Sequence, residues 1–340
     1  MRIVLVGFGS VGKALASLIE ERRDELYRLC GLSPRLVCVI DSGGAAVGPR
    51  GLSARDLLDA KATGTVANIA EMGLTGIDAA RLIRDTAADV LVESSPSDIK
   101  DPRRAIEHFK SAFASGKHAV SVNKAPLAVA LPALNQLARY NRVLFRYSGT
   151  VGAGTPVLAT ARTLAAGDRI LKVRGILNGT TNFILHRMAE RGDGYPAALA
   201  EAVRLGYAET DPSADVDGID TATKVVIIAS AVLGLDATIG DVGIAGIRDI
   251  PSERIAAAAA AGQALKLIGE IDAVGGRLSV APQAVDRHGP MDVPRNLNAV
   301  EFTLEKGGPV TLVGRGAGGP ETATAILRDL VDIWHESGHP

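Results

Sequence analysis

The sequence predicts an α/β fold, in which a doubly wound parallel sheet is accompanied by a second, inserted domain of the α+β class. Three observations lead to this prediction. The chain has 340 residues, 47% of them apolar, which favours two cores over one. Over residues 1–150, short apolar runs alternate with longer amphipathic segments, as strands and helices do in parallel sheets. Beyond residue 150 this regular alternation stops, so a domain of another class is expected there.

The strands expected in the first domain are short apolar runs that fit buried parallel strands. They span residues 3–6, 36–40, 90–92, 119–122 and 143–147. Amphipathic stretches between these runs predict helices at residues 12–29, 102–115 and 131–140.

The inserted domain is expected to comprise residues 151–307. Its strands are predicted at residues 175–177, 275–280 and 298–304. Its helices are predicted at residues 182–191, 196–205, 218–233 and 252–267, the last because it contains an alanine run. A final helix at about 321–335 is expected to return to the first domain, which then comprises residues 1–150 and about 308–340.

Composition excludes several classes of protein. The net charge is −1, so no basic field is available for bulk nucleic-acid binding. The only two cysteines, Cys30 and Cys38, cannot form a disulfide scaffold or a cysteine-rich metal site, and they fit a reduced, cytoplasmic setting. The longest apolar run, residues 225–235, is well short of the ~20 residues that cross a bilayer, so no membrane association is expected.

A glycine-rich loop directly follows the first predicted strand. It reads Gly7-Phe8-Gly9-Ser10-Val11-Gly12, the G-x-G-x-x-G pattern of Rossmann-type dinucleotide-binding domains. The first glycine permits a tight turn, the second lets the backbone approach a pyrophosphate, and the third lets helix and strand pack closely. This position therefore predicts a bound dinucleotide at the helix N-terminus; the alternative is a glycine-rich turn without a ligand.

Asp41 at the end of the second strand bears on the choice of cofactor. An acid there bonds the adenosine ribose and favours NAD over NADP. It comes 29 residues after Gly12, later than the usual spacing of about 20, and Arg50 and Lys61 could instead hold a 2′-phosphate. Both NAD and NADP therefore stay open, with NAD slightly favoured; Asp41 could also be a plain turn acid.

Polar residues follow the third and fourth strands. Ligands of open α/β sheets lie beyond the carboxyl ends of the strands. Ser94, Ser95 and Lys124 occupy these ends, so they are predicted to line the nicotinamide pocket. A solvated loop lysine is the alternative for Lys124.

The most informative stretch carries five carboxylates and one lysine in sixteen residues, from Glu209 to Lys224. Asp220 and Lys224 are four residues apart on one face of a predicted helix. Because Ile227 and Ala231 continue that face with apolar side chains, the helix should be buried and the charged pair should lie in a cleft. An ordinary ion pair is the alternative; a calcium loop lacks the expected spacing and glycine.

Such a cluster suits a substrate with an ammonium or hydroxyl group, which carboxylates such as Glu209 and Asp220 can bind. A lysine held away from water has a lowered pKa, so its neutral amine can take a proton from an alcohol. A nearby second lysine, such as Lys124, would lower that pKa further, whereas adjacent carboxylates oppose the effect.

These motifs together resemble homoserine dehydrogenase over nearly the full length of the chain. The resemblance rests on the glycine loop and on four further blocks, at residues 123–128, 149–156, 175–182 and 205–224. It implies a reversible, NAD(P)-linked interconversion of L-homoserine and L-aspartate 4-semialdehyde, on the route to threonine, methionine and isoleucine. It also implies a homodimer formed through the middle domain.

The resemblance assigns roles to individual residues. Lys224 matches the lysine that transfers the proton, and Lys124 matches a second lysine near the reacting carbon. The residues that match substrate-binding positions are Glu209, Asp215, Asp220, Asn178 and Thr180. Gly318 matches a late glycine beside the cofactor.

Two departures from the family are visible. Many members bind a monovalent cation through backbone carbonyls, here those of Val151, Ala153 and Thr155, and through a glutamate, which is Ser148 in this chain. A cation is therefore doubtful. Many members also carry a C-terminal regulatory domain, which is not expected here, so no built-in threonine feedback is expected either.

Two other functions are alternatives. One is another two-domain NAD(P) oxidoreductase, such as an amino-acid or aldehyde dehydrogenase; the semialdehyde dehydrogenases need a catalytic cysteine, and Cys30 and Cys38 are both far from the expected site. A non-enzymatic NAD-sensing protein would not need Lys224, Lys124 and the acids together.

Overall fold

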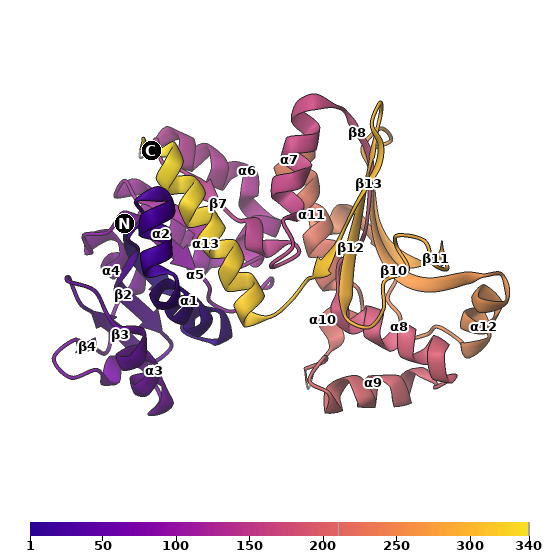
Figure 1. Cartoon of the computed structure of the whole chain (residues 1–340), viewed down its shortest axis with the longest axis horizontal. Helices are drawn as coiled ribbons and strands as arrows, with labels where there is room; N and C mark the ends of the chain where they lie inside the picture. Colours follow the sequence, from indigo (N-terminus) through magenta and orange to yellow (C-terminus); the bar gives the residue numbers. More distant parts are fainter. Residues whose placement is uncertain (210, 339–340) are drawn as a thin grey trace. The chain divides into compact units, whose positions relative to one another are not determined.

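A computed structural model describes residues 1–209 and 211–338, and the chain divides into two compact units (Figure 1). The first unit comprises Met1–Gly154 and Gly318–Pro340, and the second comprises Thr155–Ala317. The predicted return to the first unit at about residue 308 is ten residues early, because a strand at Gly308–Arg315 pairs within the second unit.

The first unit is built on a seven-stranded sheet with the order β4-β3-β2-β1-β5-β6-β7. Its strands are β1 (Arg2–Val6), β2 (Arg35–Asp41), β3 (Gly44–Val47), β4 (Gly73–Leu74), β5 (Val90–Glu93), β6 (His118–Ser121) and β7 (Phe145–Arg146). The five predicted strands are present and run parallel. The β2–β3 and β3–β4 pairs are antiparallel, and β3 and β4 were not predicted.

The strand order changes direction at β1, which pairs with β2 on one side and with β5 on the other. A doubly wound sheet binds its ligand in the crevice at such a point, beyond the carboxyl ends of the strands. The doubly wound, Rossmann-type fold predicted from the sequence is therefore confirmed.

Helices pack around this sheet. They are α1 (Ser10–Glu21), α2 (Arg23–Cys30), α3 (Ala54–Ala62), α4 (Ala79–Asp85), α5 (Arg103–Ala114), α6 (Ala125–Tyr140) and α13 (Gly319–Glu336). The helix predicted at 12–29 is two helices separated at Arg22. Helix α6 begins earlier than predicted and is kinked at Ala130, two residues before Pro132, whose missing N–H and ring disturb the preceding turn.

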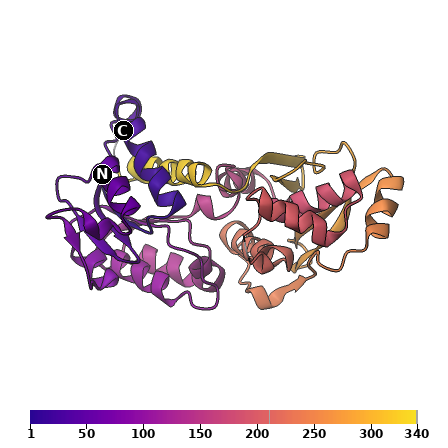
Figure 2. The same ribbon diagram turned by 90° about the horizontal axis from the view of Figure 1, so that it is seen from below.

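The last helix of the chain belongs to the first core. Figure 2 shows α13, in yellow, beside the indigo helices of the N-terminal segment, and α13 packs extensively on α1. Ile326 and Leu330 of α13 are buried in one cluster with Leu5 of β1 and Leu15 of α1. The C-terminal segment thus completes a core that the first strand begins.

The second unit has a six-stranded sheet with the order β13-β12-β8-β10-β11-β9. Its strands are β8 (Ile170–Ile176), β9 (Val242–Ile244), β10 (Gln263–Asp272), β11 (Arg277–Asp286), β12 (Leu297–Leu304) and β13 (Gly308–Arg315). All neighbours pair antiparallel except β9 and β11. The helices are α7 (Val157–Gly167), α8 (Gly179–Arg191), α9 (Tyr195–Arg204), α10 (Ser213–Val216), α11 (Ile219–Leu233) and α12 (Ser252–Ala260).

The predicted helix at 252–267 is wrong in its second half. Helix α12 stops at Ala260, Gly262 adopts a positive φ of 73°, and strand β10 begins at Gln263. Alanines favour a helix locally, but β10 lies between β8 and β11. Its pairing and the burial of Leu265 and Leu267 outweigh the local preference.

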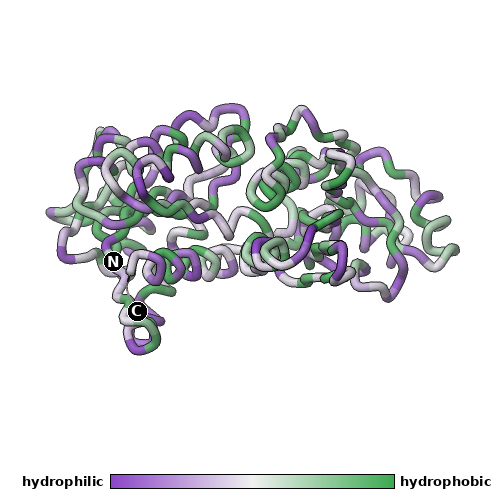
Figure 3. The backbone as a smooth tube through the Cα atoms, turned by 90° about the horizontal axis from the view of Figure 1, so that it is seen from above, coloured by the Kyte–Doolittle hydropathy of each residue, from purple (hydrophilic) through white to green (hydrophobic). Residues whose placement is uncertain are grey.

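Helix α11 packs against β10 and β11. A methyl group added to Gly269 of β10 would lie 2.6 Å from Val225 and 3.0 Å from Thr221, so the absent side chain lets the helix approach the strand closely. Apolar and polar stretches alternate along the chain (Figure 3), and among the described helices none is at once long and apolar enough to span a bilayer.

Candidate functional site

The glycine loop of the first unit leaves no room for side chains at two of its glycines. Gly7 has a φ of +92°, and an added methyl group would lie 2.5 Å from the backbone of Ser94 and Ser95. A methyl group on Gly12 would lie 2.2 Å from the carbonyl oxygen of Gly7. Both glycines are therefore required for the loop to fold between β1 and α1.

Gly9 differs from its two neighbours in the motif. A methyl group there would meet no atom within 4 Å, so the fold itself does not require a glycine at this position. Open space over a backbone at the start of α1, whose first turn holds no acidic residue, fits a pyrophosphate that needs to approach the backbone.

The predicted late glycine lies beside this loop. Gly318 has a φ of +126°, and a methyl group on the adjacent Gly319 would lie 2.4 Å from Oγ of Ser10. The start of α13 thus contacts the start of α1, so Gly318 is next to the loop that it was predicted to accompany.

Two hydrogen bonds tie the end of β5 to the glycine loop. The hydroxyl of Ser94 donates to the carbonyl oxygens of Val6 (3.0 Å) and Gly7 (2.8 Å). The backbone N–H and the hydroxyl of Ser95 both donate to Oε1 of Glu93. Ser94 and Ser95 therefore border the loop, as expected of residues that line a cofactor pocket.

A buried polar network links the ends of β5 and β6. Glu93 is fully buried and its Oε2 lies 2.6 Å from Nδ1 of His108. The Asn123 amide donates to Oγ of Ser95 (3.2 Å), and the N–H of Lys124 donates to Oγ of Ser97 (2.9 Å). The half-buried Lys124 is thus fixed at the start of α6.

The pairing of Glu93 with His108 was not predicted. The sequence did contain a hint of this pair, because Glu93 directly follows a buried apolar run and a buried carboxylate needs polar partners. Its partner lies fifteen residues away on α5 and could not be inferred from spacing.

Asp41, predicted to bind ribose, already has four partners within the protein. Its carboxylate accepts hydrogen bonds from Lys61 Nζ (2.6 Å), Thr65 Oγ1 (2.6 Å), and the backbone N–H groups of Gly43 (2.9 Å) and Val66 (3.1 Å). Burial acts to raise the pKa of Asp41, but these bonds outweigh it and leave that pKa below its usual value. The side chain is 3% exposed, so Asp41 and Lys61 form one neutral pair at the end of β2.

In the second unit, Lys224 lies within the protein rather than in solvent. Its Nζ is 2.6 Å from Oδ2 of Asp220 and 2.5 Å from the carbonyl oxygen of Leu177, and its side chain is 8% exposed. Every residue of α11 from Thr221 to Ala229 is buried, so this part of the helix takes Lys224 into the protein with it. A lysine so placed is a candidate for proton transfer.

Asn178 joins the acids of this cluster. Its Nδ2 donates to Asp215 Oδ1 (2.6 Å) and Asp220 Oδ2 (3.0 Å), and its Oδ1 accepts the N–H of Thr181 (2.9 Å) at the N-cap of α8. Burial, and then the charge of Asp220, raises the pKa of Asp215. Three elements, α8, α10 and α11, therefore supply one acidic cluster that contains Lys224.

Two other predicted residues lie around this cluster. The hydroxyl of Thr180 donates to the carbonyl oxygen of Tyr207 (2.6 Å), and its proximity to Asp215 limits the rise of that pKa. Glu209 is exposed and adjoins position 210, which lies outside the described residues.

The expected cation site lacks its carboxylate. Ser148 is buried, and its N–H donates to Oδ2 of Asp329 on α13 (2.9 Å). Among the described residues no group of three or more His, Cys, Asp or Glu side chains could hold a metal ion. A hydroxyl thus replaces the family's glutamate among the expected ligands, and no reaction step is assigned to a cation.

The cysteines offer no nucleophile. Cys38 is buried in β2, and burial raises the pKa of its thiol to about 12. Cys30 ends α2 and its Sγ lies 3.2 Å from the carbonyl oxygen of Leu26. A mechanism that needs a thiolate is therefore not supported.

Known proteins resemble this chain along its whole length. The profile of the family described as homoserine dehydrogenase matches residues 156–331. A homoserine dehydrogenase of Methanocaldococcus jannaschii is 39% identical, over 99% of both chains. An NAD(+)-dependent homoserine dehydrogenase of Pseudomonas canavaninivorans is also 39% identical, over 99% of this chain and 96% of that protein.

Solved structures agree with these relatives. A hyperthermophilic archaeal homoserine dehydrogenase in complex with NADPH has a TM-score of 0.86 at 28% identity and covers 98% of both chains. A homoserine dehydrogenase of Thiobacillus denitrificans has a TM-score of 0.84 at 29% identity, over 99% of this chain and 74% of that one. With the glycine loop and the acidic cluster around Lys224 in place, the chain belongs to the homoserine dehydrogenase family.

Proposed function

We propose that this protein is a homoserine dehydrogenase, an oxidoreductase that interconverts L-homoserine and L-aspartate 4-semialdehyde with NAD(P). The observation that carries the proposal is the buried Lys224, held against Asp220 in a cluster with Asp215 and Asn178. Two relatives at 39% identity that cover the chain and are named for this activity support it.

The first unit is proposed to bind the dinucleotide. Gly7 and Gly12 shape the loop, and the open space at Gly9 fits a pyrophosphate against the backbone. Ser94, Ser95 and Lys124 follow the strand ends where the nicotinamide is expected. When bound, the cofactor supplies a hydride to the aldehyde carbon or accepts one from the alcohol carbon.

NAD is proposed as the slightly favoured cofactor. The carboxylate of Asp41 neutralises Lys61, so this lysine is not a free positive charge for a 2′-phosphate. One relative is named as NAD(+)-dependent, whereas another was solved in complex with NADPH. NADP therefore stays the alternative.

Lys224 is proposed to move the proton. In the reducing direction its ammonium donates a proton to the oxygen of the forming alcohol, and in the oxidising direction its amine accepts that proton. Asp220 and the carbonyl oxygen of Leu177 accept hydrogen bonds from Nζ, so they stabilise the ammonium and orient it. Lys124 is proposed as the second lysine near the reacting carbon.

The acids are proposed to hold the amino-acid part of the substrate. Asp215, Asp220 and Glu209 would attract its ammonium, and Asn178 and Thr180 would fix the geometry of these carboxylates. The second unit is thus proposed to bind the substrate. It is also proposed to form the homodimer contact, and the reaction is proposed to belong to the biosynthesis of threonine, methionine and isoleucine.

A direct assay tests the proposal. Purified protein is mixed with L-homoserine and either NAD+ or NADP+, and the absorbance of the reduced nicotinamide is followed, with L-serine as the control substrate. Turnover with L-homoserine well above that with L-serine is expected. An absence of turnover with both cofactors, while either still binds, would overturn the proposal in favour of a nucleotide-sensing protein.

A further inference from the structure

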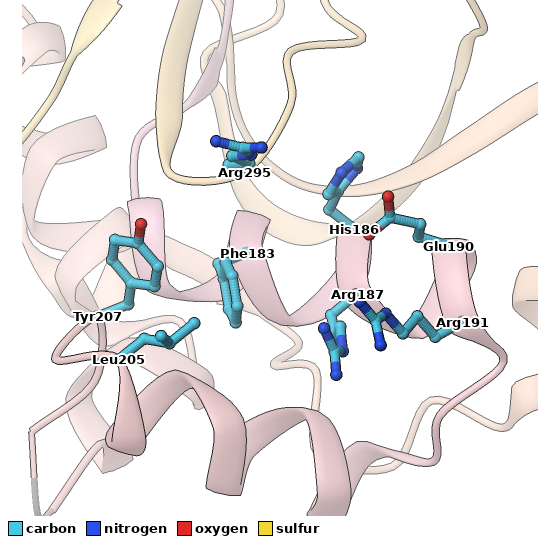
Figure 4. A pocket seen from close by; sticks show the side chains of 8 residues that line it. All are labelled: Phe183, His186, Arg187, Glu190, Arg191, Leu205, Tyr207 and Arg295. Carbon is cyan, nitrogen blue, oxygen red and sulfur yellow. The ribbon is translucent and has the colours of Figure 1, made fainter.

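A pocket of about 320 Å³ opens on the second unit, apart from the buried contacts of Lys224 (Figure 4). Most of its lining projects from α8, and the rest comes from the segment after α9 and from Arg295 on the loop before β12. Its volume is at the lower end of the range for small-molecule sites.

The charges around the pocket are mainly positive. Arg187, Arg191 and Arg295 line it, against a single carboxylate, that of Glu190. His186 also lines it, but burial lowers the pKa of its imidazole, so this side chain is uncharged at neutral pH. Arg187 is paired with Asp193 (2.8 Å), but in the described part of the chain neither Arg191 nor Arg295 has a carboxylate within ion-pair distance. Two guanidinium groups are thus available to an external anion.

The opposite part of the lining is apolar. The rings of Phe183 and Tyr207 have their centroids 4.7 Å apart, and Leu205 lies beside them. Arg295 joins the lining from a different segment of the chain (Figure 4). The pocket therefore presents both an apolar surface and positive charge.

Arg295 is held in place by a buried clamp. Its φ of +52° is a left-handed conformation that residues other than glycine rarely adopt. On either side of it, the carbonyl oxygens of Val293 (3.1 Å) and Leu297 (3.0 Å) accept hydrogen bonds from the amide of Asn182 on α8. The clamp keeps this strained residue fixed relative to α8.

A buried lysine completes the clamp. Nζ of Lys266 donates to the Val293 carbonyl oxygen (2.7 Å) and to Oδ1 of Asn182 (3.0 Å). Lys266 is 1% exposed and Asn182 is fully buried. Burying a lysine costs free energy unless it is well bonded, and backbone strain retained by such bonding is a sign of function.

We propose that this pocket binds a small organic anion, in which a carboxylate or phosphate group is joined to an aromatic or apolar part. The anion would bond Arg295 and Arg191, since guanidinium groups form charge-assisted, bidentate bonds with such groups. The apolar part would lie on Phe183 and Tyr207.

A ligand bound in the pocket is expected to alter the geometry of the acidic cluster around Lys224. This expectation rests on the proposed function. Helix α8 carries most of the pocket residues, and the residue at its N-cap, Asn178, bonds Asp215 and Asp220. The carbonyl oxygen of Tyr207 accepts the Thr180 hydroxyl. A ligand that shifts Tyr207 or α8 would therefore change the KM for L-homoserine.

Calorimetric titration of the full chain with phenyl phosphate, inorganic phosphate and benzyl alcohol tests the binding. Phenyl phosphate is expected to bind in a saturable manner and more tightly than the other two. R295Q and R191Q should each weaken it about tenfold, the loss of one charge-assisted contact. R277Q, an arginine on the exposed β10–β11 turn, is the matched control and should have no effect.

Two results would overturn the pocket. One is no saturable binding of phenyl phosphate, and the other is equal affinity in the wild type, R295Q and R191Q. R191Q lies outside the clamp, so it keeps the test decisive if R295Q does not fold. If phenyl phosphate binds in a saturable manner but the protein does not oxidise L-homoserine, the proposed binding site is supported and the proposed function is rejected. If the protein oxidises L-homoserine but does not bind phenyl phosphate, only the proposed binding site is rejected.

Discussion

The ammonium nitrogen of Lys224 lies 2.6 Å from Oδ2 of Asp220, the residue one helical turn before it on α11. The same carboxylate oxygen accepts a hydrogen bond from Asn178 at 3.0 Å. This pair of residues is 8% and 12% exposed, so it differs from a surface ion pair, which contributes little and is screened by salt. Its position makes proton transfer, rather than helix stability, the property to test.

Replacing Lys224 by alanine is expected to lower kcat by 10²–10⁴-fold, the usual contribution of a positioned acid or base. Dissociation constants for NAD+ and NADP+ should stay near wild-type values, because the glycine loop is untouched. Stopped-flow kinetics and cofactor titration by fluorescence measure the two quantities. A parallel loss of cofactor binding would instead indicate a structural role for Lys224.

Glu209→Gln is expected to raise the KM for L-homoserine about tenfold and change kcat little, since it removes a charge that binds substrate ammonium rather than the reacting group. Glu201, a half-buried glutamate of α9 paired with Arg204, provides the control as Glu201→Gln. An unaltered KM in the Glu209 variant would contradict a role in substrate binding.

Asp41→Ala is expected to shift the ratio of kcat/KM for the two cofactors about tenfold toward NADP. Removal of the carboxylate leaves Lys61 without its 2.6 Å partner, and a ribose 2′-phosphate can then take its place. Asp59→Ala, on the same helix as Lys61 and exposed, should leave the ratio as in the wild type. If Asp41→Ala lowers both values equally, Asp41 has no part in the choice of cofactor.

Gly9→Ala and Gly12→Ala should fail in different ways. A methyl group on Gly12 would overlap the Gly7 carbonyl at 2.2 Å, so this variant should unfold at a lower temperature. Gly9→Ala meets no protein atom and should keep its Tm while losing cofactor affinity. A Gly9 variant that binds NAD+ normally would show that the pyrophosphate does not approach this backbone.

The stability of the protein is expected to depend on Asp329 between about pH 4 and 6. Burial raises the pKa of this carboxyl from 3.8 to about 6, although the Ser148 bonds oppose the shift. In that interval the folded state binds more protons than the unfolded state, so the free energy of unfolding falls as pH rises. At pH 7 this ionised carboxylate lowers the free energy of unfolding by about 3 kcal/mol.

Urea unfolding at pH 4 and pH 7 checks this dependence. Asp329→Asn should remove the part of the pH dependence that this carboxyl causes, whereas Asp59→Asn, at an exposed position of α3, should retain it. An unchanged difference between the two pH values in Asp329→Asn would mean that other groups cause it.

Local patterns predicted those parts of the fold and site that lie close together in the chain. The glycine loop and the pairing of Asp220 with Lys224 both depend on residues within six positions of each other. The bond from Asn178 to Asp220 spans 42 residues, so Asn178 was assigned only through the family resemblance. The Glu93–His108 pair was missed for the same reason.

Strands were harder to predict than helices where tertiary pairing overrode local preference. Strand β10 follows the alanine run after only Gly262, and its pairing with two neighbours in the sheet makes it a strand. The short strands β3 and β4 consist of glycine, alanine, valine and leucine and have too few residues to show any periodicity.

The packing of α13 on α1 affects when the first unit can fold during translation. Leu5 and Leu15 leave the ribosome early, but Ile326 and Leu330, which share their core, are added more than 300 residues later. The second unit is one continuous segment and can fold during translation. Leu5 and Leu15 therefore lack these two core partners until α13 has been translated, so the first unit is expected to complete its core later than the second.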